Sequence, residues 1–181
     1  MPLTIKIPAA DLYDTKSGRF ITRKETTLTF EHSLLSISKW EAKWHKSFFL
    51  KDPKTEEENL DYVRCMCLTK DIDPIIFRTL GYNNFKLISD YIGDPMTGTT
   101  IKKHQERPSR EIITSELVYF WMTNFGIPFS PCEKWHFNRL MTLIEIASIK
   151  NTPPKKVGAR EAANQRSLLN AQRRAKHNTR G

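Results

Sequence analysis

Two apolar stretches decide the fold, SREIITSELVYFWMTNFG at residues 109–126 and SPCEKWHFNRLMTLIEIASIKN at residues 130–151. In the first stretch, Ser109 can cap a helix, and Glu111 falls in the first turn, where the helix dipole favours a negative charge. Apolar residues then recur at helical spacing until Gly126 stops the pattern. The members of this apolar stripe are Ile113, Leu117, Phe120 and Trp121.

The second stretch opens with its own helix-start signals. Ser130 is the expected cap, Pro131 the first helical residue, and Glu133 the second member of a capping box. The stripe that follows ends near Asn151, and its members are Phe137, Leu140, Met141, Ile144 and Ala147. Together the two stretches predict an antiparallel hairpin of two long helices over residues 109–150, which we expect to form the core of the protein.

The residues before this hairpin predict a small sheet and then shorter helices. Apolar residues alternate with polar ones at 3–7, and short strand-like runs follow at 20–22 and 27–30. Helices are expected over about 33–46, from Thr55 with Glu58 as a capping box, from Asp73-Pro74 to Gly81, and from Asn83 or Asn84 to Gly93. Residues 94–108 lack periodicity and predict the longest loop.

The fold class is therefore mainly α with an α+β character. We expect a small N-terminal antiparallel β region at 1–30 packed on the helices, a helical domain at 31–150 built on the hairpin, and a basic C-terminal tail at 151–181. Residues 159–176 are good helix formers with little apolar content, so the tail is expected to be flexible or partly helical.

The positive charge of the protein is concentrated in this tail. The net charge of the chain is +9, and the segment from residue 155 onward holds eight basic residues and one acidic residue, Glu161. Nucleic acid, an acidic protein surface, or solubility alone would each account for such a segment, which lacks the aromatic residues needed for base stacking. The basic residues are Lys155, Lys156, Arg160, Arg166, Arg173, Arg174, Lys176 and Arg180.

The predicted helix at 33–46 carries the candidate partner-binding face. Ile37, Trp40 and Trp44 recur every three or four residues, and Lys39 and Lys43 beside them would attract an acidic partner. We expect either Trp40 or Trp44 to be substantially exposed in the free protein, because tryptophan is enriched at binding hot spots. The alternative is that both indoles are core residues.

No pattern in the chain indicates catalysis, a metal or a cofactor. Cys132 and His136 lie four residues apart on one predicted helix, but nothing completes the three or four ligands that zinc needs. Four glutamates near the hairpin are candidates for an acid–base pair, although helix-start roles and solvated faces explain them more simply. They are Glu111, Glu116, Glu133 and Glu145.

Composition also bounds the cellular setting. No apolar run approaches the roughly 18 residues that a membrane span needs, and the N-terminus lacks a basic start followed by an apolar run. The odd set Cys65, Cys67 and Cys132 fits a reducing cytoplasm rather than a disulfide framework.

Several blocks of the sequence resemble the tail assembly chaperones of long-tailed bacteriophages. The resemblance covers most of the chain from residue 28 onward and is least clear over 94–108. The blocks are FEHSLLSISKWEAKW at 30–44, REIITSELVYFWM at 110–122, IPF at 127–129, EKWHFNRLMTLI at 133–144 and LNAQRR at 169–174.

The resemblance implies a non-enzymatic protein of the host cytoplasm. Such a chaperone binds the tape measure protein before tail tube subunits assemble around it, and it is often made in a short form and a frameshifted long form. Self-association is a further partner to expect, and no catalytic, metal-binding or cofactor residue carries over. A basic structural or nucleic-acid-associated virion protein is the alternative that the tail suggests.

Overall fold

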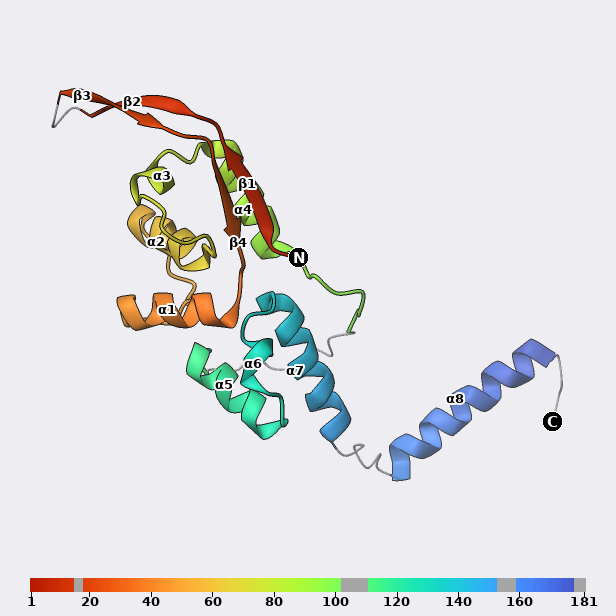
Figure 1. Cartoon of the computed structure of the whole chain (residues 1–181). Coiled ribbons are helices and arrows are strands. Elements are labelled where there is room, and N and C mark those ends of the chain that lie inside the picture. Colours follow the sequence, from red (N-terminus) through yellow and green to blue (C-terminus); the bar gives the residue numbers. More distant parts are fainter. Residues whose placement is uncertain (15–17, 102–110, 153–158, 178–181) are drawn as a thin grey trace. The chain divides into compact units, whose positions relative to one another are not determined.

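The computed structural model describes residues 1–14, 18–101, 111–152 and 159–177 (Figure 1). The chain forms two compact units, Met1–Ser148 and Ile149–Gly181. Within the described residues the protein is mainly helical with a small amount of antiparallel sheet, which confirms the predicted fold class in its coarse form. No helix among these residues is long and apolar enough to cross a membrane.

The N-terminal residues form one long antiparallel hairpin. Strand β1 (Leu3–Ile7) pairs with β4 (Thr26–Phe30), and β2 (Ala10–Asp14) pairs with β3 (Arg19–Arg23), so that the second pair continues from the first (Figure 1). Three of these strands were predicted. β2 was missed because ADLYD lacks a clear alternation of apolar and polar residues, and it is extended because its neighbours bring it opposite β3.

One face of the β1–β4 pair is buried against the helices. Ile5, Ile7, Leu28 and Phe30 are all at most 5% exposed, because the period of two puts them on the same side of the sheet. The outer edge of β4 does not remain open, since the N–H of Leu68 donates to the Thr29 oxygen at 2.8 Å. Both features attach the sheet to the helical part of the unit.

Helix α1 (Leu34–Trp44) lies at the centre of the helical part. It begins with a capping box in which Ser33 and Ser36 exchange side-chain and backbone hydrogen bonds, and it ends at His45 in the left-handed conformation. Its main packing partners are α2 (Glu56–Met66) and α5 (Ser115–Asn124). The predicted capping box of α2 is confirmed, since Thr55 and Glu58 exchange hydrogen bonds of 3.2 and 2.8 Å.

Two shorter elements follow α2. Helix α3 (Ile75–Arg78) lies within the predicted segment, and α4 (Tyr82–Gly93) begins just after Gly81, one or two residues earlier than expected. Its end at Gly93 agrees with the prediction. The described part of the predicted loop, residues 94–101, contains no helix or strand, and the rest of it lies outside the described residues.

The predicted start of α5 is wrong. Residues 111–114 are not helical, and Thr114 caps the helix by accepting from the Leu117 N–H at 3.4 Å. Glu111 therefore precedes the helix, and Ser109 lies outside the described residues. Thr114 offers the same capping chemistry as Ser109 five residues later, which the sequence pattern could not distinguish.

The predicted buried stripe of α5 is also wrong. The residues that face the core are Ser115, Val118 and Met122, whereas Phe120 is 57% exposed and Trp121 is only partly buried. Because α5 carries apolar residues on nearly all sides, its periodicity could not decide which side is buried.

The second half of the predicted hairpin is correct only in part. Residues Phe129–Cys132 form a short helix α6. The expected capping box of Ser130 and Glu133 is wrong, because the Glu133 N–H donates to the Phe129 backbone oxygen at 2.7 Å and the Glu133 carboxylate accepts from the Tyr119 hydroxyl. Helix α7 (Phe137–Asn151) begins later and ends where predicted, with Phe137, Leu140 and Ile144 buried. The hairpin is therefore not confirmed as the core, since α5 packs chiefly on α1.

Unit Ile149–Gly181 contains helix α8 (Ala159–His177), in agreement with the helix predicted over 159–176. Residues 153–158 and 178–181, which include part of the predicted linker and the predicted frayed end, lie outside the described residues.

Replacing Leu140 by Ala should lower the free energy of unfolding by about 2–5 kcal/mol, because its side chain is fully buried and would leave a cavity. Phe120→Ala, on the exposed side of α5, should change it by no more than about 0.5 kcal/mol. Urea unfolding of the two variants measures both values. Equal destabilisation by the two substitutions would contradict the orientation of α5.

Candidate functional site

The structure buries two of the five residues of the predicted partner-binding face. Ile37 and Trp40 are 0% exposed, and the indole N–H of Trp40 donates to the backbone oxygen of Glu58 at 2.9 Å. The expectation of an exposed apolar groove along this helix is therefore wrong at both residues. Their alternative, a place in the core, is what the structure shows, because α2 covers this face of α1.

Two of the three remaining members of the predicted face contact α2. Asp61 accepts from the ammonium of Lys43 at 2.5 Å and from the indole N–H of Trp44 at 3.0 Å, so Trp44 is only partly exposed. Lys39 is exposed. A partner approaching this helix would meet the Lys43–Asp61 ion pair rather than a tryptophan anchor.

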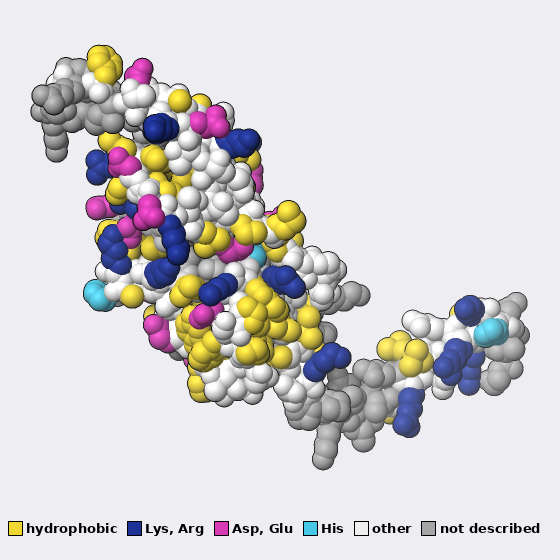
Figure 2. Space-filling model, in the orientation of Figure 1, with side chains coloured by type: hydrophobic (Ala, Val, Ile, Leu, Met, Phe, Trp, Pro, Cys, Tyr) yellow, Lys and Arg dark blue, Asp and Glu magenta, His cyan; other side chains and the backbone are white. Residues whose placement is uncertain are grey.

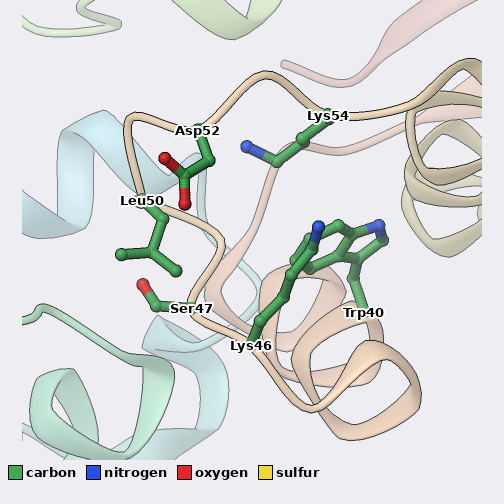
Figure 3. A pocket seen from close by; sticks show the side chains of 6 residues that line it. All are labelled: Trp40, Lys46, Ser47, Leu50, Asp52 and Lys54. Atoms are coloured by element: carbon green, nitrogen blue, oxygen red, sulfur yellow. The ribbon is translucent and has the colours of Figure 1, made fainter.

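Two lysines cover the outer edge of Trp40. The ammonium groups of Lys46 and Lys54 lie 5.7 and 5.5 Å from the ring centroid, in a small hollow that Ser47, Leu50 and Asp52 also line (Figure 3). Partial burial, together with the charge of Lys46, lowers the pKa of Lys54. The hollow is thus filled by cation–aromatic contacts and does not form a binding cavity.

A buried carboxylate joins α1 to α5. The Glu41 side chain is 6% exposed, and it accepts hydrogen bonds from the Phe48 N–H at 2.7 Å, the Ser115 N–H at 2.7 Å and the Ser115 hydroxyl at 2.5 Å. Ser115 is the first residue of α5, so the carboxylate lies at the positive end of that helix dipole. These bonds fix the position and the direction of α5 relative to α1.

The opposite side of α5 forms the candidate binding surface. Phe120 and Phe129 are 57% and 46% exposed. The Phe129 ring packs edge-on against the Tyr119 ring, with 5.1 Å between the ring centroids. Apolar side chains gather over α5, α6 and α7 in Figure 2, where charged side chains are sparse. We call Tyr119, Phe120 and Phe129 the α5–α6 surface, and its location was not predicted because these residues were assigned to the core or not considered.

Tyr119 is the member of this surface whose side chain is hydrogen-bonded to the rest of the unit. Its hydroxyl donates to the Glu133 carboxylate at 3.1 Å, and burial, with the Glu133 bond as the second cause, raises the pKa of Tyr119 to about 12. The phenol therefore stays neutral at physiological pH and holds the first turn after α6 against α5. Nearby, the Arg139 guanidinium lies 4.4 Å from the Trp135 ring centroid.

Two buried histidines meet where the sheet, α2 and α7 converge. The centroids of the His32 and His136 rings are 5.2 Å apart, and His32 Nδ1 is hydrogen-bonded to the Tyr62 hydroxyl. His136 Nε2 donates to the backbone oxygen of Tyr91 at 3.0 Å, while His136 Nδ1 accepts from the Asn138 backbone N–H at 3.3 Å. One nitrogen donates and the other accepts, which is the pattern of a neutral imidazole.

Burial and the neighbouring His136 lower the pKa of His32 from 6.5 to about 3, and burial lowers the pKa of His136 as well. Both histidines are therefore uncharged when the protein is folded near neutral pH. The Glu31 carboxylate, one residue before His32, accepts from the Tyr91 hydroxyl at 2.6 Å. The hydrogen bonds of the His32 and His136 rings are therefore those of buried, hydrogen-bonded core groups.

The described residues contain no group of three or more His, Cys, Asp or Glu side chains that could hold a metal ion. Cys132 and His136 are both buried, and burial raises the pKa of the Cys65 and Cys67 thiols. Of the four glutamates considered, Glu111 and Glu116 are exposed, Glu133 and Glu145 are partly buried, and Glu133 holds the Tyr119 hydroxyl.

The structure places four of the basic tail residues on the surface of α8. Arg166, Arg173, Arg174 and Lys176 are all exposed. Arg160 belongs to the helix, but its side chain is not described, and Lys155, Lys156 and Arg180 lie outside the described residues.

No protein-family model, curated protein or solved structure matches this chain.

Acidification should destabilise the protein between pH 6.5 and about 3. In this range His32 is protonated in the unfolded chain but stays neutral in the folded protein, where its pKa is about 3. Each such histidine lowers the free energy of unfolding by about 1.4 kcal/mol per pH unit well below 6.5. Urea unfolding from about pH 7 to about pH 5 measures the slope. His32→Gln should flatten it, whereas His45→Asn, at an exposed residue, should not; identical slopes in all three proteins would refute the assignment.

Replacing Glu41 by Gln should lower the free energy of unfolding by about 2–3 kcal/mol, since the amide cannot accept all three hydrogen bonds and turns a donor toward buried donors. Glu116→Gln, an exposed carboxylate in the first turn of α5, should cost less than about 1 kcal/mol. Chemical denaturation compares the two variants, and a Glu41→Gln protein as stable as the parent would show that the carboxylate does not hold α5.

Proposed function

We propose that this protein is a non-enzymatic tail assembly chaperone of a long-tailed bacteriophage, which acts in the host cytoplasm and binds the tape measure protein through the α5–α6 surface. The resemblance of five sequence blocks supports the family assignment. Two of those blocks, at 110–122 and 127–129, contain Phe120 and Phe129, the exposed aromatic residues of this surface.

The observation that carries the proposal is the two-sided apolar character of α5. A helix that is apolar on nearly all sides is normally buried on all sides. In this unit one side of α5, with Val118 and Met122, faces the core, while Phe120 on the other side is exposed. Exposed aromatic side chains of this size cost solvation free energy, which a partner would relieve.

An amphipathic helix is the client that suits such a surface. Helical clients bind through apolar side chains three or four residues apart, and a tape measure protein is expected to present helices of this kind. Phe120 and Phe129 would supply two anchors. Tyr119 packs against the Phe129 ring, and its hydrogen bond to Glu133 holds it in place. The surface is shallow and partly solvated, which suits capture followed by release during tail assembly. A frameshifted long form, or a second copy of the chain, would present the same surface.

Co-expression with the tape measure protein of the same phage, followed by pull-down, tests the proposal. Phe120→Ala and Phe129→Ala together should reduce the captured amount by about tenfold or more, because two exposed anchors are removed. The melting temperature of this variant should stay close to that of the parent, since both side chains are about half exposed.

The matched control is Tyr82→Ala with Leu87→Ala on α4. These side chains are 82% and 50% exposed, so the control removes comparable apolar surface elsewhere in the same unit. Capture should be unchanged. A parent protein that fails to capture the tape measure protein would refute the proposed function, and equal losses in both variants would refute the α5–α6 surface as its site.

A further inference from the structure

Helix α8 has two different faces. Along one face, side chains recur at spacings of three and four residues, which places them on a single line of the helix surface. Every described side chain of α8 is exposed, so this face is available to a partner. The members of the line are Ala163, Arg166, Asn170, Arg173 and His177, and Arg174 and Lys176 flank it.

The described side chains of the opposite face are uncharged. Asn164, Leu168, Ala171 and Ala175 recur at spacings of four, three and four residues, away from the arginines. Among the described side chains, Arg166, Arg173 and Arg174 thus lie on one side of α8, and Lys176 lies at its edge. Gathering like charges on one face of a helix is unfavourable in isolation, and it becomes favourable when an anionic partner neutralises them.

We propose that the basic face of α8 binds the backbone of double-stranded DNA, with the helix lying in the major groove. This activity is separate from client binding at the α5–α6 surface and does not depend on it.

The composition of the basic face favours a phosphate backbone over an acidic protein. Protein interfaces depend on large apolar or aromatic anchors at their centre. Among its described residues this face has no Phe, Trp or Tyr, and its one large apolar neighbour is Leu169, which lies beside Arg166 and Arg173 at helical spacing. Phosphate binding needs only cations and hydrogen-bond donors, and the guanidinium groups of Arg166, Arg173 and Arg174 form paired hydrogen bonds with phosphate oxygens.

Shape favours duplex DNA over other nucleic acids. An α-helix is about 10–12 Å across and the major groove of B-DNA is about 12 Å wide, whereas the major groove of double-stranded RNA is too narrow. Ala163 and Asn170 are short side chains on the basic face, so the helix backbone can approach the floor of the groove. The absence of aromatic side chains from α8 argues against base stacking with single strands.

The test is fluorescence anisotropy of a labelled duplex of about 20 base pairs titrated with the full chain at several salt concentrations. The logarithm of the binding constant should fall with the logarithm of salt with a slope of about −4, from four neutralised phosphates. Arg166→Gln, Arg173→Gln and Arg174→Gln combined should weaken binding on the order of 100-fold at about 0.1 M salt, and should reduce the magnitude of the slope by about 3. Glutamine preserves helix propensity, so α8 itself should persist.

Two matched controls make the result specific. Lys51→Gln, Lys70→Gln and Lys86→Gln remove the same charge from exposed sites of the other unit, and should change the affinity by no more than about threefold. Leu168→Gln, Ala171→Gln and Ala175→Gln alter the opposite face of α8, and should leave the slope unchanged.

Four outcomes would overturn the proposal. The first is no binding of the duplex by the parent protein. The second is an equal loss of affinity in the arginine variant and in the lysine control, which would assign binding to overall charge. The third is tighter binding of a single strand of the same length. The fourth is displacement of the duplex by an equally charged polyglutamate at lower concentration, which would indicate an acidic protein as the partner.

Discussion

The helical part of the first unit depends on the Glu41 carboxylate. Removing a carboxylate from water is unfavourable unless hydrogen bonds replace its hydration, and here two backbone N–H groups and one hydroxyl do so. The bonds to Ser115 determine where α5 begins, and with it which side of α5 meets α1. The exposure of Phe120 is a consequence of that choice. A core interaction therefore sets the position of the surface to which we assign client binding.

Features with local causes could be predicted from the sequence, and features that depend on distant residues could not. The capping box of Thr55 and Glu58 and the stripe of α7 were predicted because their determinants lie within a few residues. The burial of Trp40 by α2 and the orientation of α5 depend on which elements become neighbours. One signal was available: the run LVYFW at 117–121 has no polar side, which indicates a helix with two apolar faces.

The two candidate binding elements differ in physical character. The α5–α6 surface is aromatic, rigidly supported and part of the first unit, so its expected partner is an apolar helix face. Helix α8 is almost devoid of large apolar residues, and its binding would be electrostatic and sensitive to salt. The location of the first was not predicted, because strongly apolar segments are usually core. The basic character of the second was evident from composition alone, while the alignment of its arginines on one face required the helix to be established.

The Glu41–Ser115 bonds join residues 74 positions apart in the chain, and the Ser47 hydroxyl reaches the Ile113 oxygen across 66 positions. A mainly helical protein of this size would ordinarily be rich in local contacts and fold quickly. Here the Glu41 side chain on α1 can form its hydrogen bonds to Ser115 only after residue 115 has left the ribosome. Closure of the loop between these residues, 74 positions apart, must therefore precede stable packing of α1 against α5. Until then the α1 carboxylate stays hydrated, and the apolar side of α1 lacks one of its two helical neighbours. Folding of this protein therefore depends on the late synthesis of the segment that also carries the α5–α6 surface, to which we assign client binding.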